Sequence, residues 1–425
     1  MTVETISGLA GPSRLCLAAD PRVCLAGLAP SVSIGRRPCN PHSQPDARPC
    51  PSGGPPGQTV KTMQKKSQRL VELDFLRGLV LLVIVVDHIG GSILSRFTLH
   101  SYAFCDAAEV FVFLGGYATA TAYLSLAAKR DETAARLRFM RRALEIYRAF
   151  LVTAGLMLVI SAAFVALGMD EAPNLAYADL DSLTSTPFQS LIDILLLRRQ
   201  PYLASVLPMY AFFALAVPLA LPLARKKPWL LAAGSVALWA AASHAIPYLP
   251  AADDMHWDFN PFAWQLMFLL GVLARCQPVY QRVSTSHFGP LVSGAAFVII
   301  AALCFAKLVG VEAALRPEFK QNLEWLRVVN FLAIAWLVAD MIRIGWVGKT
   351  AEWLPWIGIV GRKGLLCFIA GTGISLIVDS ALYTMTDGLL DVPLGLAADA
   401  IAIGALLAVA KVYGPLVRVL AVKTS

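Results

Sequence analysis

The residues of this 425-residue chain with the clearest chemical potential lie in one apolar stretch around residue 80. Arg77 and His88 are eleven positions apart, which on an α-helix is three turns plus about 20°, so both lie on one helix face. The rise between them is roughly 16 Å. Ionisable side chains inside an apolar span are costly and mark a functional site by default. A buried histidine suits general-base catalysis because small changes in its surroundings move its pKa through neutrality.

Two carboxylates flank this pair in the same stretch. Asp74 lies about one turn before Arg77 and is positioned to form an ion pair with it. Asp87 directly precedes His88, so its side chain points about 100° away from the imidazole. It could therefore orient the ring only through a bent geometry, or it serves a different partner.

The next apolar stretch opens with two further carboxylates, Asp106 and Glu109, which share a helix face because they are three residues apart. They enter the membrane from the outer side, so we expect them to meet His88 in the outer third of the bilayer. Gly116 lies on the same face as Glu109 and permits the close approach of a helix or ligand. The candidate catalytic residues are His88, Arg77, Asp87, Asp106 and Glu109.

Each of these groups also has a structural interpretation. His88 could serve only to hydrogen-bond a neighbouring helix, and Asp74 with Arg77 could be an interfacial pair that sets helix register. Asp106 and Glu109 could lie in headgroup water. The occurrence of the whole set on two adjacent spans favours a functional site.

Membrane helices must position these residues. The chain is 57% apolar, and only 15% of its residues are charged, against roughly a quarter in an average soluble domain. A helix needs about 20 apolar residues to cross ~30 Å of hydrocarbon. We therefore predict an all-α membrane bundle of about ten helices, over residues 74–95, 105–128, 149–168, 203–224, 228–250, 260–274, 288–310, 323–342, 364–385 and 393–413.

The distribution of basic residues predicts the orientation of the bundle. The predicted loop 129–148 holds seven Lys or Arg, whereas the predicted loop 169–187 holds none and has four Asp or Glu. Because cytoplasmic loops are enriched in Lys and Arg, this alternation along the chain places both termini in the cytoplasm. The apolar run 188–197 is too short to span, so we expect it to lie at the surface or to re-enter.

Residues 1–69 read as a disordered basic tail. Ten of the 26 prolines fall within residues 1–62, and residues 1–69 hold nine Lys or Arg against three Asp or Glu. Met63 is followed by a basic segment and then the first span, so we expect translation to begin near Met63. The domain prediction is then a transmembrane domain over residues 70–415 and a short cytoplasmic tail over 416–425.

Composition and motifs narrow the class of protein further. Most of the net charge of +8 lies in the tail, so we predict no nucleic-acid partner. The spacing of the eight cysteines is too irregular for a zinc site, and we predict neither a metal nor a tightly bound cofactor. We assign His100 to a loop and place three other histidines at span ends: His244, His256 and His287.

Five stretches resemble one family of integral-membrane enzymes. They are LDFLRG at 73–78 continuing to Asp87-His88, DAAEVFVFLGGY at 106–117, RALEIYR at 142–148, LPMY at 207–210 and NPFAWQL at 260–266. Together they resemble OpgC-type proteins, the succinyltransferases of osmoregulated periplasmic glucans, which are related to the acyltransferase type 3 group. That group shares an arginine and a histidine separated by ten residues, which here are Arg77 and His88.

The resemblance implies a reaction for the candidate residues. An acyl group, such as succinyl, would pass from a cytoplasmic acyl-CoA to a hydroxyl of a periplasmic glucan or another envelope polysaccharide, in the bacterial inner membrane. His88 would take the hydroxyl proton, with Asp87, or Asp106 and Glu109, orienting the imidazole. Arg77 would face the thioester end of the donor or hold the helix.

The same resemblance implies substrate-binding residues. Basic residues on the cytoplasmic side would meet the phosphates of the coenzyme. The candidates for substrate binding are the basic residues Arg141, Arg142 and Arg148, together with Tyr147, Asn260, Trp264 and Gln265. The chain departs from the family pattern at Gly115, where a serine is usual, and at Phe150, where a histidine is expected, so its donor or acceptor could differ.

Two other classes of protein remain open at this stage. Intramembrane histidines and carboxylates also form the proton relays of secondary transporters, although the sequence shows no clear internal repeat. A membrane scaffold or sensor is the third possibility, but it does not explain four ionisable residues in one span. The expected partners are the lipid bilayer and a glycan acceptor.

Overall fold

The fold is known from a computed structural model that describes residues 59–169, 172–176, 180–252, 255–310 and 317–423. These residues form helices joined by short connections, and no β-strand occurs among them. The long helices are α1 (Thr59–Asp87), α3 (Ala107–Lys129), α4 (Glu132–Ala166), α8 (Val206–Lys226), α9 (Pro228–Ala240), α11 (Pro261–Cys276), α13 (Gly289–Leu308), α14 (Trp325–Arg343), α17 (Gly364–Thr386) and α18 (Val392–Lys423). The all-α prediction is confirmed for the described part of the chain.

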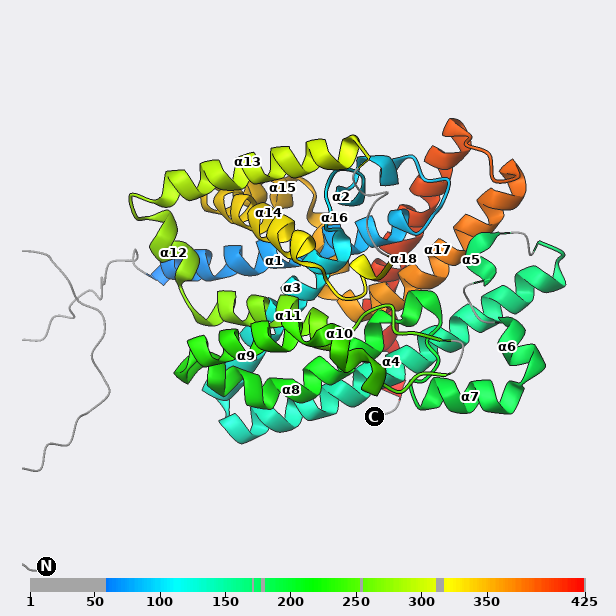
Figure 1. Cartoon of the computed structure of the whole chain (residues 1–425), viewed down its shortest axis with the longest axis horizontal. Coiled ribbons are helices and arrows are strands. Elements are labelled where there is room, and N and C mark those ends of the chain that lie inside the picture. Colours follow the sequence, from blue (N-terminus) through cyan, green and yellow to red (C-terminus); the bar gives the residue numbers. More distant parts are fainter. Residues whose placement is uncertain (1–58, 170–171, 177–179, 253–254, 311–316, 424–425) are drawn as a thin grey trace, which may run out of the picture. The chain divides into compact units, whose positions relative to one another are not determined.

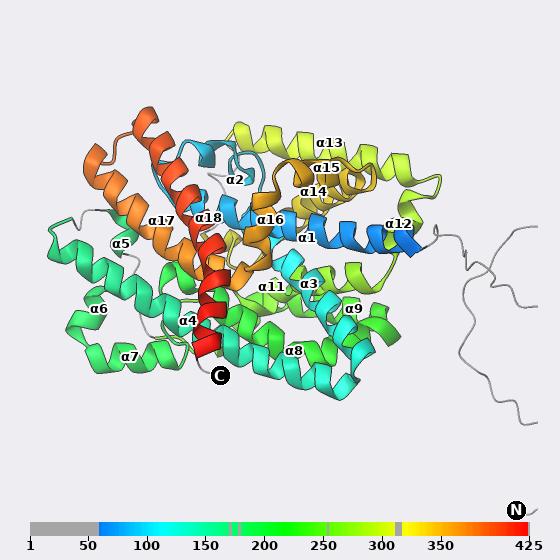
Figure 2. The same ribbon diagram turned by 180° about the vertical axis from the view of Figure 1, so that it is seen from behind.

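Shorter helices connect or cover the long ones. They are α2 (Leu99–Tyr102), α5 (Pro173–Ala176), α6 (Leu180–Ser185), α7 (Pro187–Leu195), α10 (Ala242–Ala245), α12 (Val279–Ser284), α15 (Trp346–Trp353) and α16 (Pro355–Arg362). Figures 1 and 2 show α1 beside α16, and α3 beside α11, in both views.

Each of the ten predicted spans coincides with a helix or a bent helix pair, but fewer of them qualify as spans by their own length and composition. Seven described helices are long and apolar enough to cross a membrane, and the count is eight if α9 and the segment Ala242–Tyr248, bent by 64°, form one span. The other two predicted spans are α1, whose apolar part carries several charges, and α11, which has 16 residues. The location of the termini stays a prediction.

Three predicted boundaries are wrong. Helix α4 begins at Glu132, so most of the predicted loop 129–148 is helical; Asp131 caps it by accepting the Ala134 N–H, and no Gly or Pro interrupts residues 132–154. Helix α1 begins at Thr59, so residues 59–69 are helical as well. Helix α18 runs to Lys423, well past the predicted end of the last span at residue 413, so most of the predicted tail 416–425 is helical.

The predictions for the start of the chain lie outside the described residues. These are the disorder of residues 1–58 and the environment of the cysteines there. The proposed start near Met63 also stays a prediction.

The short apolar run predicted at the surface forms α7. Its residues Phe188, Leu191 and Leu195 are exposed, whereas Ser190 and Ile194 are buried. An apolar face that remains exposed on a nine-residue helix is typical of a segment lying at a membrane surface.

Glycines set the two closest helix crossings near the candidate residues. A Cβ atom on Gly361 of α16 would overlap the backbone carbonyl of Asp74, and one on Gly78 of α1 would overlap that of Ile357. At the α3–α11 crossing, a Cβ on Gly116 would likewise meet the carbonyl of Phe268. The absence of side chains thus allows α16 to hold the part of α1 that carries Arg77.

We predict that Gly361→Ala destabilises the protein by roughly 1–3 kcal/mol, because the added methyl group forces α16 away from α1. Thermal unfolding in lipid nanodiscs measures the effect. Gly404→Ala in α18 is the matched control, since its Cβ would meet open space. Equal melting temperatures for the two variants would contradict the tight crossing.

Candidate functional site

A cavity of about 690 Å³ lies where the end of α1, the start of α3 and the first half of α17 come together. Apolar side chains, including Leu81, Ile84, Phe111 and Phe368, line part of it. Its ionisable lining residues are Asp87, His88, His100, Asp106, His256, Asp258, Glu318 and Lys320. Three of the five candidate catalytic residues therefore share one cavity: the sequence predicted that His88 would meet Asp106 and Glu109, and of these two carboxylates only Asp106 lines the cavity.

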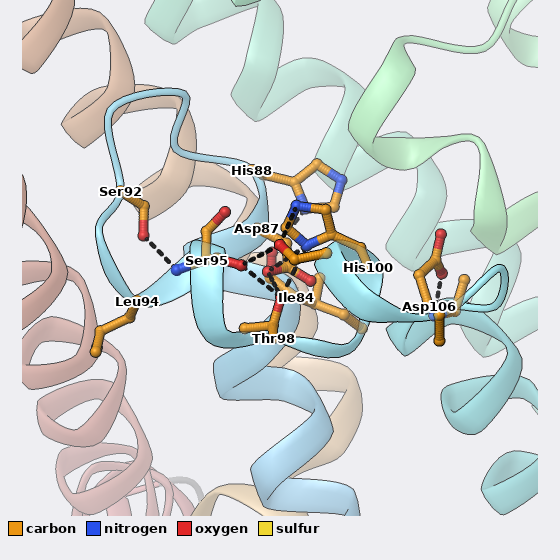
Figure 3. Close-up of polar contacts among 12 residues, drawn as sticks. Ile84, Asp87, His88, Ser92, Leu94, Ser95, Thr98, His100 and Asp106 are labelled. Carbon is orange, nitrogen blue, oxygen red and sulfur yellow. Dashed lines mark hydrogen bonds and ion pairs between the residues drawn. The ribbon is translucent and has the colours of Figure 1, made fainter. Parts of the chain in front are cut away.

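His88 is held by the helix that carries it. Its Nδ1 lies 2.6 Å from the backbone carbonyl oxygen of Ile84 (Figure 3), and because a carbonyl only accepts, Nδ1 must carry the hydrogen. Nε2 of the neutral ring is then a proton acceptor. Among the described residues, no hydrogen bond occupies Nε2, and the Tyr202 ring lies 5.9 Å away between centroids. This tautomer is the one that a general base requires.

Asp87 does not orient His88. Its Oδ1 accepts a 2.7 Å hydrogen bond from the Thr98 hydroxyl and lies 3.4 Å from Nδ1 of His100 (Figure 3). The reason is the one visible in the sequence, since neighbouring residues of a helix point about 100° apart. The structure instead joins Asp87 to His100, which the sequence analysis had assigned to an ordinary loop.

Asp106 and Glu109 begin α3 with a capping box. Asp106 accepts the Ala108 N–H at 2.7 Å, and Glu109 accepts the Asp106 N–H at 2.9 Å. Two basic residues neutralise them: Arg327 donates to both carboxylates, and Nζ of Lys320 lies 2.9 Å from Asp106. Glu109 is fully buried and does not line the cavity, so only Asp106 faces it.

Sequence reasoning missed Lys320 and Arg327. They sit just before and just inside a predicted span, where basic residues are expected as topology signals, and nothing in their spacing points to Asp106 or Glu109. Their partners are more than 200 positions away in the sequence. Desolvation at the cavity lowers the pKa of Lys320, but the carboxylates of Asp106 and Glu109 together outweigh this, so the net shift is upward and the ammonium stays charged.

Arg77 lies outside the cavity lining, among a second set of groups. Its guanidinium is close to Gly364 of α17 and within electrostatic range of Asp74, Tyr210 and Arg142. Asp74 and Arg77 do not form the predicted ion pair, since no nitrogen–oxygen contact within 4 Å joins these two described residues, and they interact only at longer range. Arg77 and His88 thus occupy separate environments, as their separation along α1 predicted.

Aromatic side chains lie between these two environments. Phe111 and Phe368, which line the cavity, are stacked with centroids 5.8 Å apart and planes at 19°. The Tyr210 hydroxyl donates to the Phe111 carbonyl oxygen at 3.0 Å, and its ring meets Phe111 edge-on. Because Tyr210 also lies within electrostatic range of Arg77, this aromatic cluster reaches from the cavity to the surroundings of Arg77.

The basic residues expected to bind the donor lie along α4. Arg141 and Arg148 are exposed, whereas Arg142 donates to Glu145 at 2.8 Å. Of the three, Arg142 lies within electrostatic range of Arg77. The Tyr147 hydroxyl donates to the backbone of Leu195, which ties α4 to α7.

The other three candidate binding residues hold the structure together and do not line the cavity. Asn260 caps α11 by accepting the Phe262 N–H, and Gln265 bonds to Ser235 of α9. Nε1 of Trp264 donates at 3.2 Å to the backbone carbonyls of Lys320 and Gln321. Through these two hydrogen bonds, Trp264 holds the segment that carries Lys320.

Two buried carboxylates fix the turn that follows His88. Asp379 of α17 accepts the Gly90 N–H at 2.7 Å and a hydrogen bond from Asn174. Asp399 of α18 accepts from the Ser92 hydroxyl at 2.6 Å and from the Leu94 N–H at 2.9 Å. Helices from the C-terminal part of the chain therefore position the end of α1.

The fold and the site define a class of protein: a multi-pass membrane helix bundle with an ionisable cavity among its helices. The family model described as OpgC protein matches residues 69–417, and the chain belongs to this family. Membership indicates a membrane acyltransferase. No curated protein and no solved structure matches the chain.

Removing Arg327 would leave Glu109 as an unpaired buried charge. We predict that Arg327→Met destabilises the protein by about 3–5 kcal/mol. The double variant Arg327→Met/Glu109→Gln should recover part of this loss, since the uncompensated carboxylate is gone. Thermal unfolding of the two variants measures the difference. A double variant less stable than Arg327→Met would contradict the pairing.

Asp258 gives a pH-dependent prediction. Burial raises the pKa of its carboxyl, although the Ser205 hydroxyl opposes the shift. A raised pKa means that the folded state favours the protonated form, so stability falls as pH rises through the ordinary value of about 3.9. Asp258→Asn should therefore melt at a higher temperature than the wild type at pH 7. The gain should vanish below about pH 4, and a gain that persists there would contradict the assignment.

Proposed function

We propose that this protein transfers an acyl group from a coenzyme A thioester on the cytoplasmic side to a hydroxyl of an envelope glycan. The observation that carries the proposal is the tautomer of His88, a cavity-lining residue whose Nδ1–H is held by the Ile84 carbonyl, so that Nε2 is the proton acceptor. Family membership supports acyl transfer as the reaction class. The resemblance implies that the transferred acyl group is succinyl.

The transfer needs only one proton acceptor at the reaction centre. The acceptor oxygen bonds to the acyl carbon, the thioester C–S bond breaks, and the hydroxyl proton passes by way of Nε2 of His88 to the departing sulfur. The pairing of Asp106 with Lys320 leaves an ammonium group near the same cavity, where it favours the negative charge that develops on the carbonyl oxygen.

The donor has to cross the distance between the two ends of the site. Arg142 and Arg77 form the basic entrance for the coenzyme, whose flexible arm extends toward His88 past Phe111 and Phe368. The rise of roughly 16 Å between Arg77 and His88 suits a long arm bearing a terminal thioester.

The transporter alternative would need a continuous relay of proton-binding groups. Among the described residues, three carboxylates at the cavity contact neighbouring groups in separate sets: Asp87 with Thr98 and His100, Asp106 with Lys320 and Arg327, and Asp258 with His256. Family membership favours acyl transfer over transport.

We predict that His88→Ala lowers acyl transfer by about 10²–10⁴-fold, since the proton acceptor is lost. Arg77→Ala should also abolish transfer. The measurement is incorporation of a labelled acyl group into envelope glycans in cells that express each variant in place of the wild type. His244→Ala, an exposed position away from the cavity, is the control for expression and folding. Wild-type incorporation in the His88 variant, or pH-dependent solute uptake without acylation, would contradict the proposal.

A further inference from the structure

We propose that His100 is the acceptor-binding residue of the cavity, and that the acceptor is a neutral polyol. His100 accepts a hydrogen bond from one hydroxyl group of the acceptor, while His88 takes the proton from another. This inference rests on the proposed function and extends it from the reaction to the recognition of the acceptor.

The hydrogen bonds around Thr98 place a hydrogen on Nδ1 of His100. The single hydroxyl hydrogen of Thr98 is directed at Asp87 Oδ1, 2.7 Å away, and at the Ser95 carbonyl oxygen, 2.8 Å away, and both of these atoms accept. Nδ1 of His100 lies 2.8 Å from the same Thr98 oxygen. The hydrogen of that contact must therefore come from Nδ1, and Asp87 at 3.4 Å attracts the ring.

This arrangement leaves Nε2 of His100 available as an acceptor. Its partner among the described residues is the Ser101 hydroxyl at 3.5 Å, the outer limit of a hydrogen bond. That hydroxyl also donates to Ser95 at 3.3 Å. The His100 side chain is 42% exposed and lines the cavity, so a ligand hydroxyl can replace the weak contact.

The two histidines present the same kind of atom to one space. Nδ1 of His88 is held by a backbone carbonyl, Nδ1 of His100 by a hydroxyl backed by a carboxylate, and both rings line the same cavity. Figure 3 shows them side by side at the end of α1, and each lies within electrostatic range of the other. Two proton acceptors in one cavity match a ligand that offers two hydroxyl groups.

The charges of the cavity select a neutral ligand. The lining carries four carboxylates, from Asp87, Asp106, Asp258 and Glu318, against one lysine, Lys320. A negatively charged acceptor would be repelled by this lining.

The other lining groups suit a carbohydrate. Carboxylate oxygens accept hydrogen bonds from hydroxyl groups, and the rings of Tyr202 and Phe259 supply apolar faces beside them. The lining thus matches the mixed polar and apolar surface of a sugar ring.

Binding of simple glucosides tests the inference without relying on turnover. The protein in lipid nanodiscs is titrated with methyl β-D-glucopyranoside and its four monodeoxy derivatives, and ligand-detected NMR gives the dissociation constants. The wild type should bind at least one monodeoxy derivative about 3- to 10-fold more weakly than the parent sugar, the effect of one lost hydrogen bond. His100→Ala should bind the parent sugar more weakly by a similar factor and lose that discrimination.

Further variants separate binding from structure and from catalysis. His100→Gln keeps a hydrogen-bonding group and should retain part of the affinity, and His244→Ala should match the wild type. Unchanged dissociation constants in His100→Ala, or a wild type that binds none of the glucosides, would overturn the inference. A wild type that binds them with the predicted pattern but transfers no acyl group would overturn only the proposed function.

Discussion

Charge compensation in an apolar bundle is the constraint on which the rest of the structure depends. Glu109 is fully buried, and a buried carboxylate without a partner destabilises a fold by several kcal/mol. Arg327 and Lys320 therefore bind the start of α3 to α14 and to the segment before it. The same bonds place Asp106 at the cavity and keep a lysine ammonium beside it. A structural requirement thus also shapes the electrostatics of the site.

The end of α1 illustrates how a helix terminus is turned into a site. The helix stops at Asp87, inside the predicted span, and the backbone groups of the following turn are satisfied by Asp379 and Asp399 from α17 and α18. His88 and His100 then lie on either side of this turn. The C-terminal helices act on the site through the backbone, which explains why carboxylates outside the cavity matter for its geometry.

Phe111, Phe368 and Tyr210 form an aromatic cluster that reaches from the cavity with the two histidines to the surroundings of Arg77. In the transfer proposed above, the acyl arm of the donor would pass these rings to reach His88. The cavity lining is mainly acidic, whereas Arg77 and Arg142 lie together outside it.

Local properties of the chain were enough to predict an all-α bundle of membrane helices and the family, because apolar runs and short motifs depend on neighbouring residues alone. Helix α4 was predicted too short. The arginines of residues 129–148 led to the prediction of a loop there, although no Gly or Pro interrupts the start of the helix. Only the tertiary structure showed which residues contact the charged side chains of the site. Arg327 meets Glu109 across 218 positions, and Asp87 turns to His100 because a short loop folds back. Contacts between distant segments depend on how helices pack, which no single stretch of sequence encodes.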